Sequence, residues 1–197
     1  MALVVFLRGI NVGGHRRFRP AALAAALEHL DAVNIGAAGT FVIRRKVTRT
    51  RLRAELVTRL PFRSEIVICD ASAILDLLSR DPFAAVRIPR GAVRFVSILS
   101  KRPRLSPSMP VAFPSTGAWL LKILAREDRF VVGVYRRHMK VIGYLAGLDR
   151  IFGVPATTRN WNTMTAISEV LGKLRPSPSS STGCSASSRS RPVSGPG

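Results

Sequence analysis

The sequence predicts an α+β fold built from two small subdomains. Segments rich in β-branched and aliphatic residues, such as residues 3–8 and 65–69, alternate with segments whose leucines recur at helical spacing. The chain has 197 residues, which is enough for one domain or for two subdomains that share a core. We therefore expect a first subdomain over about residues 1–88 and a second over about residues 89–175.

The first half alternates strands and helices. We expect strands at residues 3–8, 40–44 and 65–69, separated by helices at residues 20–30 and around 52–60. Pro20 suits the first turn of the first helix, and Thr48 or Thr50 can cap the second. This β-α-β-α-β order is compatible with a split β-α-β, ferredoxin-like subdomain.

The rest of the chain adds a hairpin and further helices. Ser72 can cap a helix that stops at Asp81 before a proline. We then expect a strand at 93–99, a proline-rich loop at 103–114, a hairpin of 119–125 with 130–135, and a helix ending at Phe152 with Gly153 as its left-handed cap. A last helix carries on one face Trp161, Met164, Ile167 and Leu171. Residues 176–197 are mostly Ser, Pro and Gly and are expected to form a disordered tail.

The charge of the chain is strongly positive. The formal net charge is +20, from 31 Lys and Arg residues against 11 Asp and Glu residues. Such an excess attracts polyanions, so nucleic acid or another anionic partner is possible. Only five of the 31 cations are Lys, which also fits the coding bias of a GC-rich genome. The candidate polyanion-binding residues are Arg44, Arg45 and Lys46, and a further basic group spans residues 136–140.

Several classes of protein are disfavoured. No apolar run approaches the length of a membrane helix, and residues 1–7 are too short for a signal peptide, so we expect a cytoplasmic protein with no membrane partner. Cys69 lies in an apolar run and Cys184 in the tail, which argues against a disulfide framework. The three histidines lack the paired spacing of metal ligands, so no metal or cofactor is expected. We find no catalytic signature, and the oligomeric state is open.

Two motifs resemble binding sequences only in part. Residues 9–14 have the spacing of a phosphate-binding loop, but His15 and Arg16 stand where that loop needs Lys and Ser or Thr. Residues 39–44 keep the Gly-x-Phe-Val core of an RNA-recognition motif and lack two of its aromatic residues. A plain turn and a plain core strand explain these two segments better.

The segment from Gly153 to Thr163 is more specialised. It places threonines, an arginine and asparagines where a helix is expected to begin, and helix N-termini hold anions well. Alternatively, Thr157 or Thr158 simply caps the helix while Trp161 anchors it. The candidate ligand-binding residues of this segment and of the first loop are Arg8, Asn11, Gly13, Gly14, Thr157, Thr158, Arg159, Asn160 and Asn162.

Two long motifs carry a family resemblance. Leu7-Arg-Gly-Ile-Asn-Val-Gly-Gly14 and Gly153-Val-Pro-Ala-Thr-Thr-Arg-Asn-Trp-Asn-Thr163 resemble the two signatures of the bacterial family known as domain of unknown function 1697 (DUF1697). The resemblance covers about residues 1–173 and implies a cytoplasmic α+β protein of two subdomains, without agreed catalytic residues. Members usually have a Ser-Gly-Asn turn before the second strand, whereas this chain has Ala37-Ala-Gly-Thr40. A site that used that Ser and Asn would be altered here.

These observations leave three functions open. We expect first a non-enzymatic binding protein for an anionic partner such as nucleic acid. The alternative is an enzyme that acts on a small anionic or phosphorylated substrate, with the regions of Asn11 and Arg159 forming its pocket. A purely structural or assembly module is the third. A continuous basic face would favour the first, and a closed pocket joining Asn11 to Asn160 the second.

Overall fold

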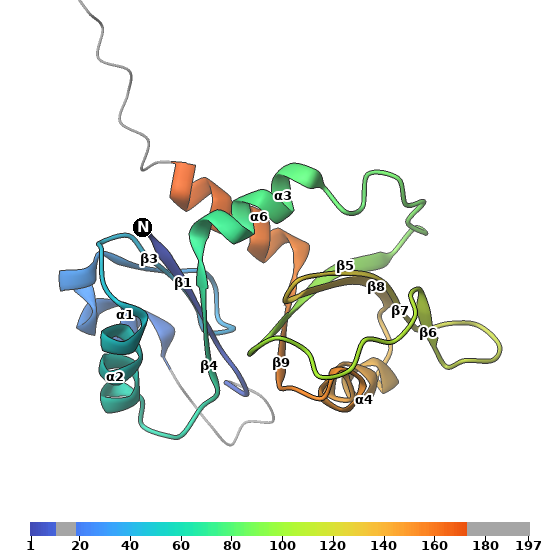
Figure 1. Cartoon of the computed structure of the whole chain (residues 1–197), viewed down its shortest axis with the longest axis horizontal. Coiled ribbons are helices and arrows are strands. Elements are labelled where there is room, and N and C mark those ends of the chain that lie inside the picture. Colours follow the sequence, from blue (N-terminus) through green and yellow to red (C-terminus); the bar gives the residue numbers. More distant parts are fainter. Residues whose placement is uncertain (11–18, 173–197) are drawn as a thin grey trace, which may run out of the picture.

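The computed structural model describes residues 1–10 and 19–172, which form two antiparallel sheets side by side (Figure 1). The first sheet contains β1 (Leu3–Leu7), β2 (Ala32–Asn34), β3 (Thr40–Ile43) and β4 (Ile66–Asp70) in the order β2-β3-β1-β4. β1 lies between β3 and β4 and is antiparallel to both, with Val4 opposite Val42 and Cys69. Every residue of β1 is buried, as expected for an aliphatic run in the centre of a sheet.

One face of the first sheet is covered by α1 (Pro20–Ala26), the 3₁₀ turn η1 (Glu28–Leu30) and α2 (Arg49–Arg59). Leu23, Leu27, Leu52 and Leu56 are buried against this face, in agreement with their helical spacing in the sequence. Thr48 caps α2, because its Oγ1 accepts the Arg51 amide N–H at 3.2 Å. The cap therefore confirms one of the two alternatives, Thr48 rather than Thr50.

Three expectations for this half need correction. The expected helix at 20–30 is two elements, α1 and η1, because the backbone of Leu27 between them leaves the helical range (φ −110°, ψ 20°). Asp31 then adopts a positive φ and turns the chain into β2, a three-residue strand too short for its pattern to predict. The helix expected after Ser72 is α3 (Ala71–Arg80), so Asp70 occupies the N-cap position and Ser72 lies within the helix. With β2 added, the element order from β1 to β4 is β-α-β-β-α-β, and α3 follows.

The second sheet has the order β6-β7-β8-β5-β9. Its strands are β5 (Ala92–Leu99), β6 (Val111–Phe113), β7 (Leu121–Glu127), β8 (Phe130–Arg136) and β9 (Ala156–Asn160). The expected hairpin is confirmed as β7 and β8, while the proline-rich loop contains the short strand β6. α4 (Lys140–Ala146) and α5 (Leu148–Phe152) pack on one face of this sheet, and Gly153 ends α5 with φ 68° as expected.

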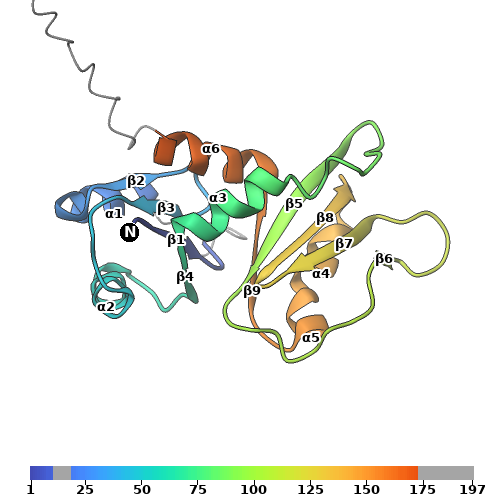
Figure 2. The ribbon, with the colours of Figure 1, turned by 45° about the horizontal axis from the view of Figure 1, so that its top comes forward.

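α3 and α6 (Trp161–Gly172) lie side by side across the top of both sheets (Figure 2). Their apolar faces close a core that both sheets share, with Phe6 and Val67 from the first sheet and Val96 and Ile98 from the second. Trp161, Met164, Ile167 and Leu171 are all buried in this core, so the face predicted for the last helix is confirmed. The two sheets therefore form one packed unit.

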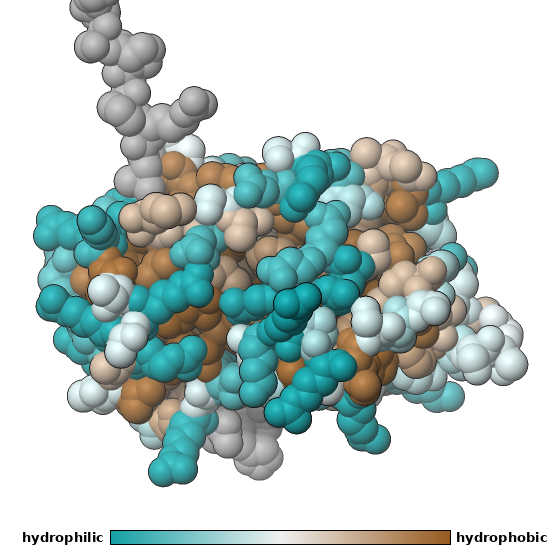
Figure 3. All heavy atoms as spheres, in the orientation of Figure 1, coloured by the Kyte–Doolittle hydropathy of each residue, from teal (hydrophilic) through white to brown (hydrophobic). Residues whose placement is uncertain are grey.

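No helix in the described residues is long and apolar enough to cross a membrane. One face of the molecule shows hydrophilic side chains over much of its surface, with smaller hydrophobic patches between them (Figure 3). The expected tail at residues 176–197 lies outside the described residues.

Candidate functional site

Arg159, the central residue of the specialised segment, is a buried cross-link between the two sheets. Its side chain leaves β9, is 7% exposed and lies over the ring of Phe6. Its donors reach acceptors on both sheets: Nε donates to Thr40 Oγ1 at 2.7 Å, and the terminal nitrogens donate to Thr157 Oγ1 at 3.0 Å and to the carbonyl oxygens of Thr158, Leu7 and Ala38 at 2.7–2.8 Å. All five N–H donors of the guanidinium are thus used by the protein.

None of these acceptors carries a charge. Burial lowers the pKa of Arg159 to about 10, so the group still carries its proton at neutral pH. A buried cation without a carboxylate is tolerated only when its donors are all hydrogen-bonded, which is the arrangement here. The geometry makes Arg159 a structural link between β9 and the ends of β1 and β3.

The turn beneath Arg159 depends on Gly39. This residue has φ +69°, and a Cβ atom there would lie 2.8 Å from Ile10 Cδ1. Its carbonyl oxygen accepts the Leu7 amide N–H at 2.8 Å. The turn Ala37-Ala-Gly-Thr40 supplies two acceptors to Arg159, the Ala38 carbonyl oxygen and the Thr40 hydroxyl. This is the turn that replaces the Ser-Gly-Asn usual in DUF1697 sequences.

Other residues of the specialised segment also have protein partners. Thr157 is buried, and the Thr158 hydroxyl lies 2.6 Å from Ser97 Oγ. Residues 156–160 form β9, so neither threonine caps the last helix and that part of the alternative is wrong. Trp161 is buried in the core, as the same alternative expected. Asn160 is the cap, because its Oδ1 accepts the Thr163 amide N–H at 2.8 Å.

At the start of the chain, Arg8 forms an ion pair with Asp149 of α5 at 2.6 Å. This pair is a second link between the two halves of the molecule. Asn11, Gly13 and Gly14 lie outside the described residues, so the expected pocket between Asn11 and Asn160 stays a prediction.

An open pocket lies next to the α6 N-terminus. β9 ends at Asn160, opposite Phe95, while β5 continues outward through Arg94, Val93 and Ala92. The space left beside this end of β5 is a cavity of about 280 Å³, which we call the β5–α6 pocket. Its lining residues are Ala92, Val93, Arg94, Arg137, Asn160, Trp161 and Asn162.

The β5–α6 pocket combines two arginines with two amides and has no carboxylate in its lining. Arg94 Cζ lies 5.7 Å from the centroid of the Phe83 ring and 5.9 Å from that of Trp161, which holds the side chain beside the pocket. Arg137 is exposed and has no ion-pair partner in residues 1–10 and 19–172. Guanidinium and amide donors beside a helix N-terminus form an environment that favours an anion.

Sequence reasoning named Asn160 and Asn162 and missed Arg94. Arg94 is distant from them in the chain and joins them only through the pairing of β5 with β9. One signal in the sequence could have pointed to the region of the β5–α6 pocket. Residues 82–126 and residues 129–148 contain no acidic residue.

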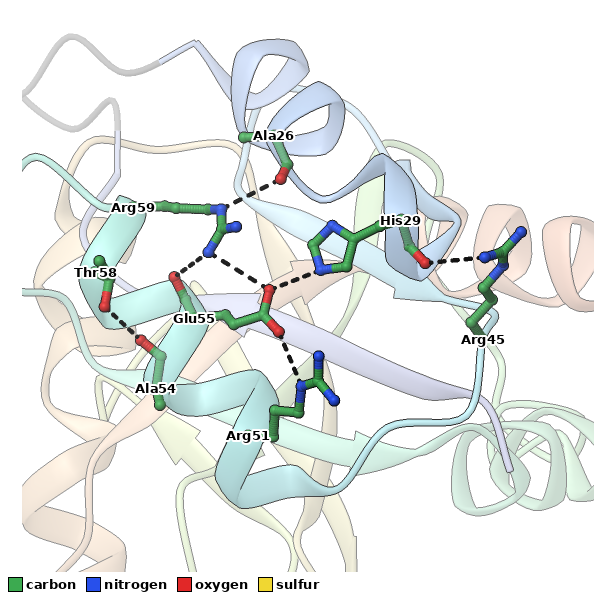
Figure 4. Close-up of polar contacts among 8 residues, drawn as sticks. All are labelled: Ala26, His29, Arg45, Arg51, Ala54, Glu55, Thr58 and Arg59. Atoms are coloured by element: carbon green, nitrogen blue, oxygen red, sulfur yellow. Dashed lines mark hydrogen bonds and ion pairs between the residues drawn. The ribbon is translucent and has the colours of Figure 1, made fainter.

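Several cations around the first sheet are paired with carboxylates. Glu55 on α2 is at the centre of a cluster in which it accepts from His29 Nε2 at 2.9 Å and from Arg51 Nε at 3.3 Å, and pairs with Arg59 at 3.4 Å (Figure 4). Arg59 also donates to the Ala26 carbonyl oxygen, so the cluster joins α2 to the end of α1. Arg49 pairs with Asp70 in the same half at 2.5 Å.

The proposed polyanion group is partly engaged as well. Arg44 donates to Asp31 Oδ1 at 2.6 Å, and this hydrogen bond raises the pKa of Arg44. Arg45 reaches the His29 carbonyl oxygen at 3.4 Å, at the edge of the cluster in Figure 4. Lys46 is exposed and has no ion-pair partner in the described part of the chain. Two of the three cations are therefore held by protein acceptors.

The described residues contain no group of three or more His, Cys, Asp or Glu side chains placed to hold a metal ion. Cys69 is buried and free, with Arg129 3.8 Å from its sulfur. Burial raises the pKa of the Cys69 thiol to about 11, against a smaller opposing effect of Arg129. The thiol is thus protonated at neutral pH and is a poor nucleophile.

The model of the family described as "Protein of unknown function (DUF1697)" matches residues 1–109 of this chain. The chain belongs to this family. The match contains the first signature, whereas the second, at residues 153–163, lies beyond it.

A solved structure, described as that of the conserved bacterial protein SP0830 from Streptococcus pneumoniae, has a similar fold. It is 16% identical, the TM-score is 0.54, and the alignment covers 86% of this chain and 98% of that one. At this identity the likeness concerns the fold alone. No curated protein matches the chain.

Proposed function

We propose that this DUF1697 protein binds an anionic, phosphate-bearing partner in the β5–α6 pocket, without catalysing a reaction on it. The observation that carries the proposal is the lining of that pocket: Arg94, Arg137, Asn160 and Asn162 converge there with no carboxylate to neutralise them. Phosphate oxygens are acceptors only, and arginine supplies donors in a geometry that matches them.

The size of the pocket sets what can enter it. At about 280 Å³ it is near the lower end of the range for sites that enclose a whole small molecule. It suits one phosphate group with part of its attached moiety. Nucleic acid, in which such groups recur along a chain, is the partner favoured by the net charge of +20.

An enzyme acting on a small phosphorylated substrate is the second candidate. The partial enclosure of the β5–α6 pocket favours it, whereas a general base or nucleophile is missing from the pocket lining. In this reading Asn160 and Asn162 position the substrate, and the catalytic group comes from elsewhere in the chain.

The proposed organisation of the chain follows the two sheets. We assign residues 1–88 to a ferredoxin-like subdomain, supported by the β-α-β-β-α-β order and by the strand order β2-β3-β1-β4. We assign residues 89–175 to a second α+β subdomain that carries the pocket. Arg8 and Arg159 belong, in this proposal, to the junction that holds the pocket strand β9 in place.

Titration of the protein with inorganic pyrophosphate, a mononucleotide and an oligonucleotide tests the proposal. We expect Arg137→Gln to lower the affinity for each of them by about tenfold or more, because one charge-assisted contact contributes about 1.5–3 kcal/mol. Arg150→Gln is the matched control, since Arg150 is an exposed arginine on α5 that does not line the pocket. Equal loss in both variants, or no binding by the wild type, contradicts the proposal.

A further inference from the structure

The pocket cations continue across the outer end of the second sheet. Arg94 on β5 and Lys122 on β7 are both paired with Val134 of β8, so all three lie in one row across neighbouring strands. Since adjacent strands are about 4.8 Å apart, the Cα atoms of Arg94 and Lys122 are about 10 Å from each other. Arg136 lies two residues beyond Val134 and therefore projects from the same face.

An aromatic ring supports the outermost of these cations. Arg136 is exposed, and its Cζ lies 4.6 Å from the centroid of the Trp119 ring. Trp119 is half-buried and packs against the shared core, so it is held in position. A guanidinium that rests on a ring in this way has its other side toward solvent, where a second planar group can stack.

The strands that carry these cations contribute no carboxylate beside them. Acidic residues are missing from residues 82–126 and again from residues 129–148, which together supply β5, β6, β8 and all of β7 except Glu127. The strip that runs from Lys122 through Arg136 to Arg94 and the β5–α6 pocket therefore carries cations at these positions and no acidic residue from β5, β8 or residues 121–126 of β7. We call it the outer strip.

We propose that the partner of the outer strip is a single-stranded nucleic acid, with a backbone phosphate in the β5–α6 pocket and a base stacked on the Arg136–Trp119 pair. This inference rests on the proposed function and narrows its favoured partner, nucleic acid, to a single strand. Proteins bind single strands through cationic grooves combined with planar side chains on which unpaired bases stack. In a duplex the bases stack on each other, so a duplex would use only the cations of the strip.

The test compares one sequence of about 12 nucleotides as a single strand and as a duplex, by fluorescence anisotropy with the full chain. Inorganic pyrophosphate is the probe for the pocket alone. We expect the single strand to bind about tenfold more tightly than the duplex, because stacking of one base is lost in the duplex. Trp119→Leu and, separately, Arg136→Gln should remove most of this preference and leave pyrophosphate binding unchanged.

Arg136→Gln keeps the test decisive if Trp119→Leu does not fold, because Arg136 is an exposed residue at the end of β8. Equal affinity for the two forms, or a preference that survives Arg136→Gln, overturns the inference. If pyrophosphate binding and its loss in Arg137→Gln are seen in the same experiment, the proposed function stands while the inference fails. If neither pyrophosphate nor either oligonucleotide binds, both fail.

Discussion

Around the first sheet the arginines face carboxylates, whereas at the outer end of the second sheet they face aromatic rings and an open pocket. Arg44, Arg49 and Arg51 each contact an acidic side chain of the same half. Arg94 and Arg136, by contrast, lie over rings of Phe83, Trp161 and Trp119. An arginine already paired with a carboxylate has less to gain from an external anion, so we expect the second region to bind anions more tightly than the first, although both are rich in cations.

Arg159 belongs to neither group. It is buried, contacts only neutral acceptors and joins the two sheets through Thr40, Leu7 and Ala38. The role of an arginine thus depends on which acceptors its donors reach, and cations in a dense run of the sequence, such as residues 44–46, need not be available to a partner.

The largest expected effect on stability comes from Arg159, which joins the two sheets. Arg159→Met leaves several buried acceptors without donors, and at about 1–3 kcal/mol for each we expect the free energy of unfolding to fall by about 3–5 kcal/mol. Arg159→Lys should restore little of this, because three donors on one nitrogen cannot reach both sheets. Urea unfolding of both variants measures the change. A loss below about 1 kcal/mol would show that the link is dispensable.

Truncating a side chain in the core that both sheets share should lower the stability nearly as much. Trp161 is 7% exposed, and its ring packs edge-on against Phe83 with the centroids 4.9 Å apart. We expect Trp161→Ala to lower the free energy of unfolding by about 3 kcal/mol, the lower end of the usual range for this truncation, because the site lies at the edge of the core. Wild-type stability would contradict this and would show that Trp161 contributes to the lining of the β5–α6 pocket rather than to the core.

Parts of this arrangement could be predicted from the sequence. The buried face of α6 and the hairpin of β7 and β8 were predictable, because regular spacing and alternation extend over whole elements. β2 and β6 have three residues each, which is too few for a pattern to stand out. Thr157 and Thr158 are residue types common at helix caps, so strand β9 resembled a helix start until its pairing with β5 was known.

The candidate site was harder to predict than the fold. Asn160 and Asn162 were named from their local pattern, and both line the β5–α6 pocket. Arg94 reaches them only through the register of β5 with β9, and register depends on long-range pairing that no local pattern contains. Whether Arg44 is paired likewise depends on Asp31, a residue in another turn of the chain.

A smaller effect is expected when the paired cluster of the first half is opened. Glu55→Gln removes the charge that holds His29, Arg51 and Arg59, and we expect the free energy of unfolding to fall by about 1 kcal/mol, since most of these partners are partly exposed. Oligonucleotide affinity at low salt should rise about two- to threefold, because two arginines become available. An unchanged affinity would show that pairing with Glu55 is not what keeps this region from binding.

The most direct test of the comparison is the salt dependence of oligonucleotide binding in two triple variants that remove the same charge. One carries Arg94→Gln, Lys122→Gln and Arg137→Gln, and the other carries Arg44→Gln, Arg45→Gln and Lys46→Gln. Each phosphate contact with a single strand contributes about 0.7 to the slope of log K against log salt, so we predict that the first triple variant flattens the slope by about two units. The second should flatten it by less than about one unit, since Arg44 and Arg45 already have protein acceptors. Equal flattening in both would show that only the net charge matters, and a larger effect of the second would move the binding surface to the first half of the molecule.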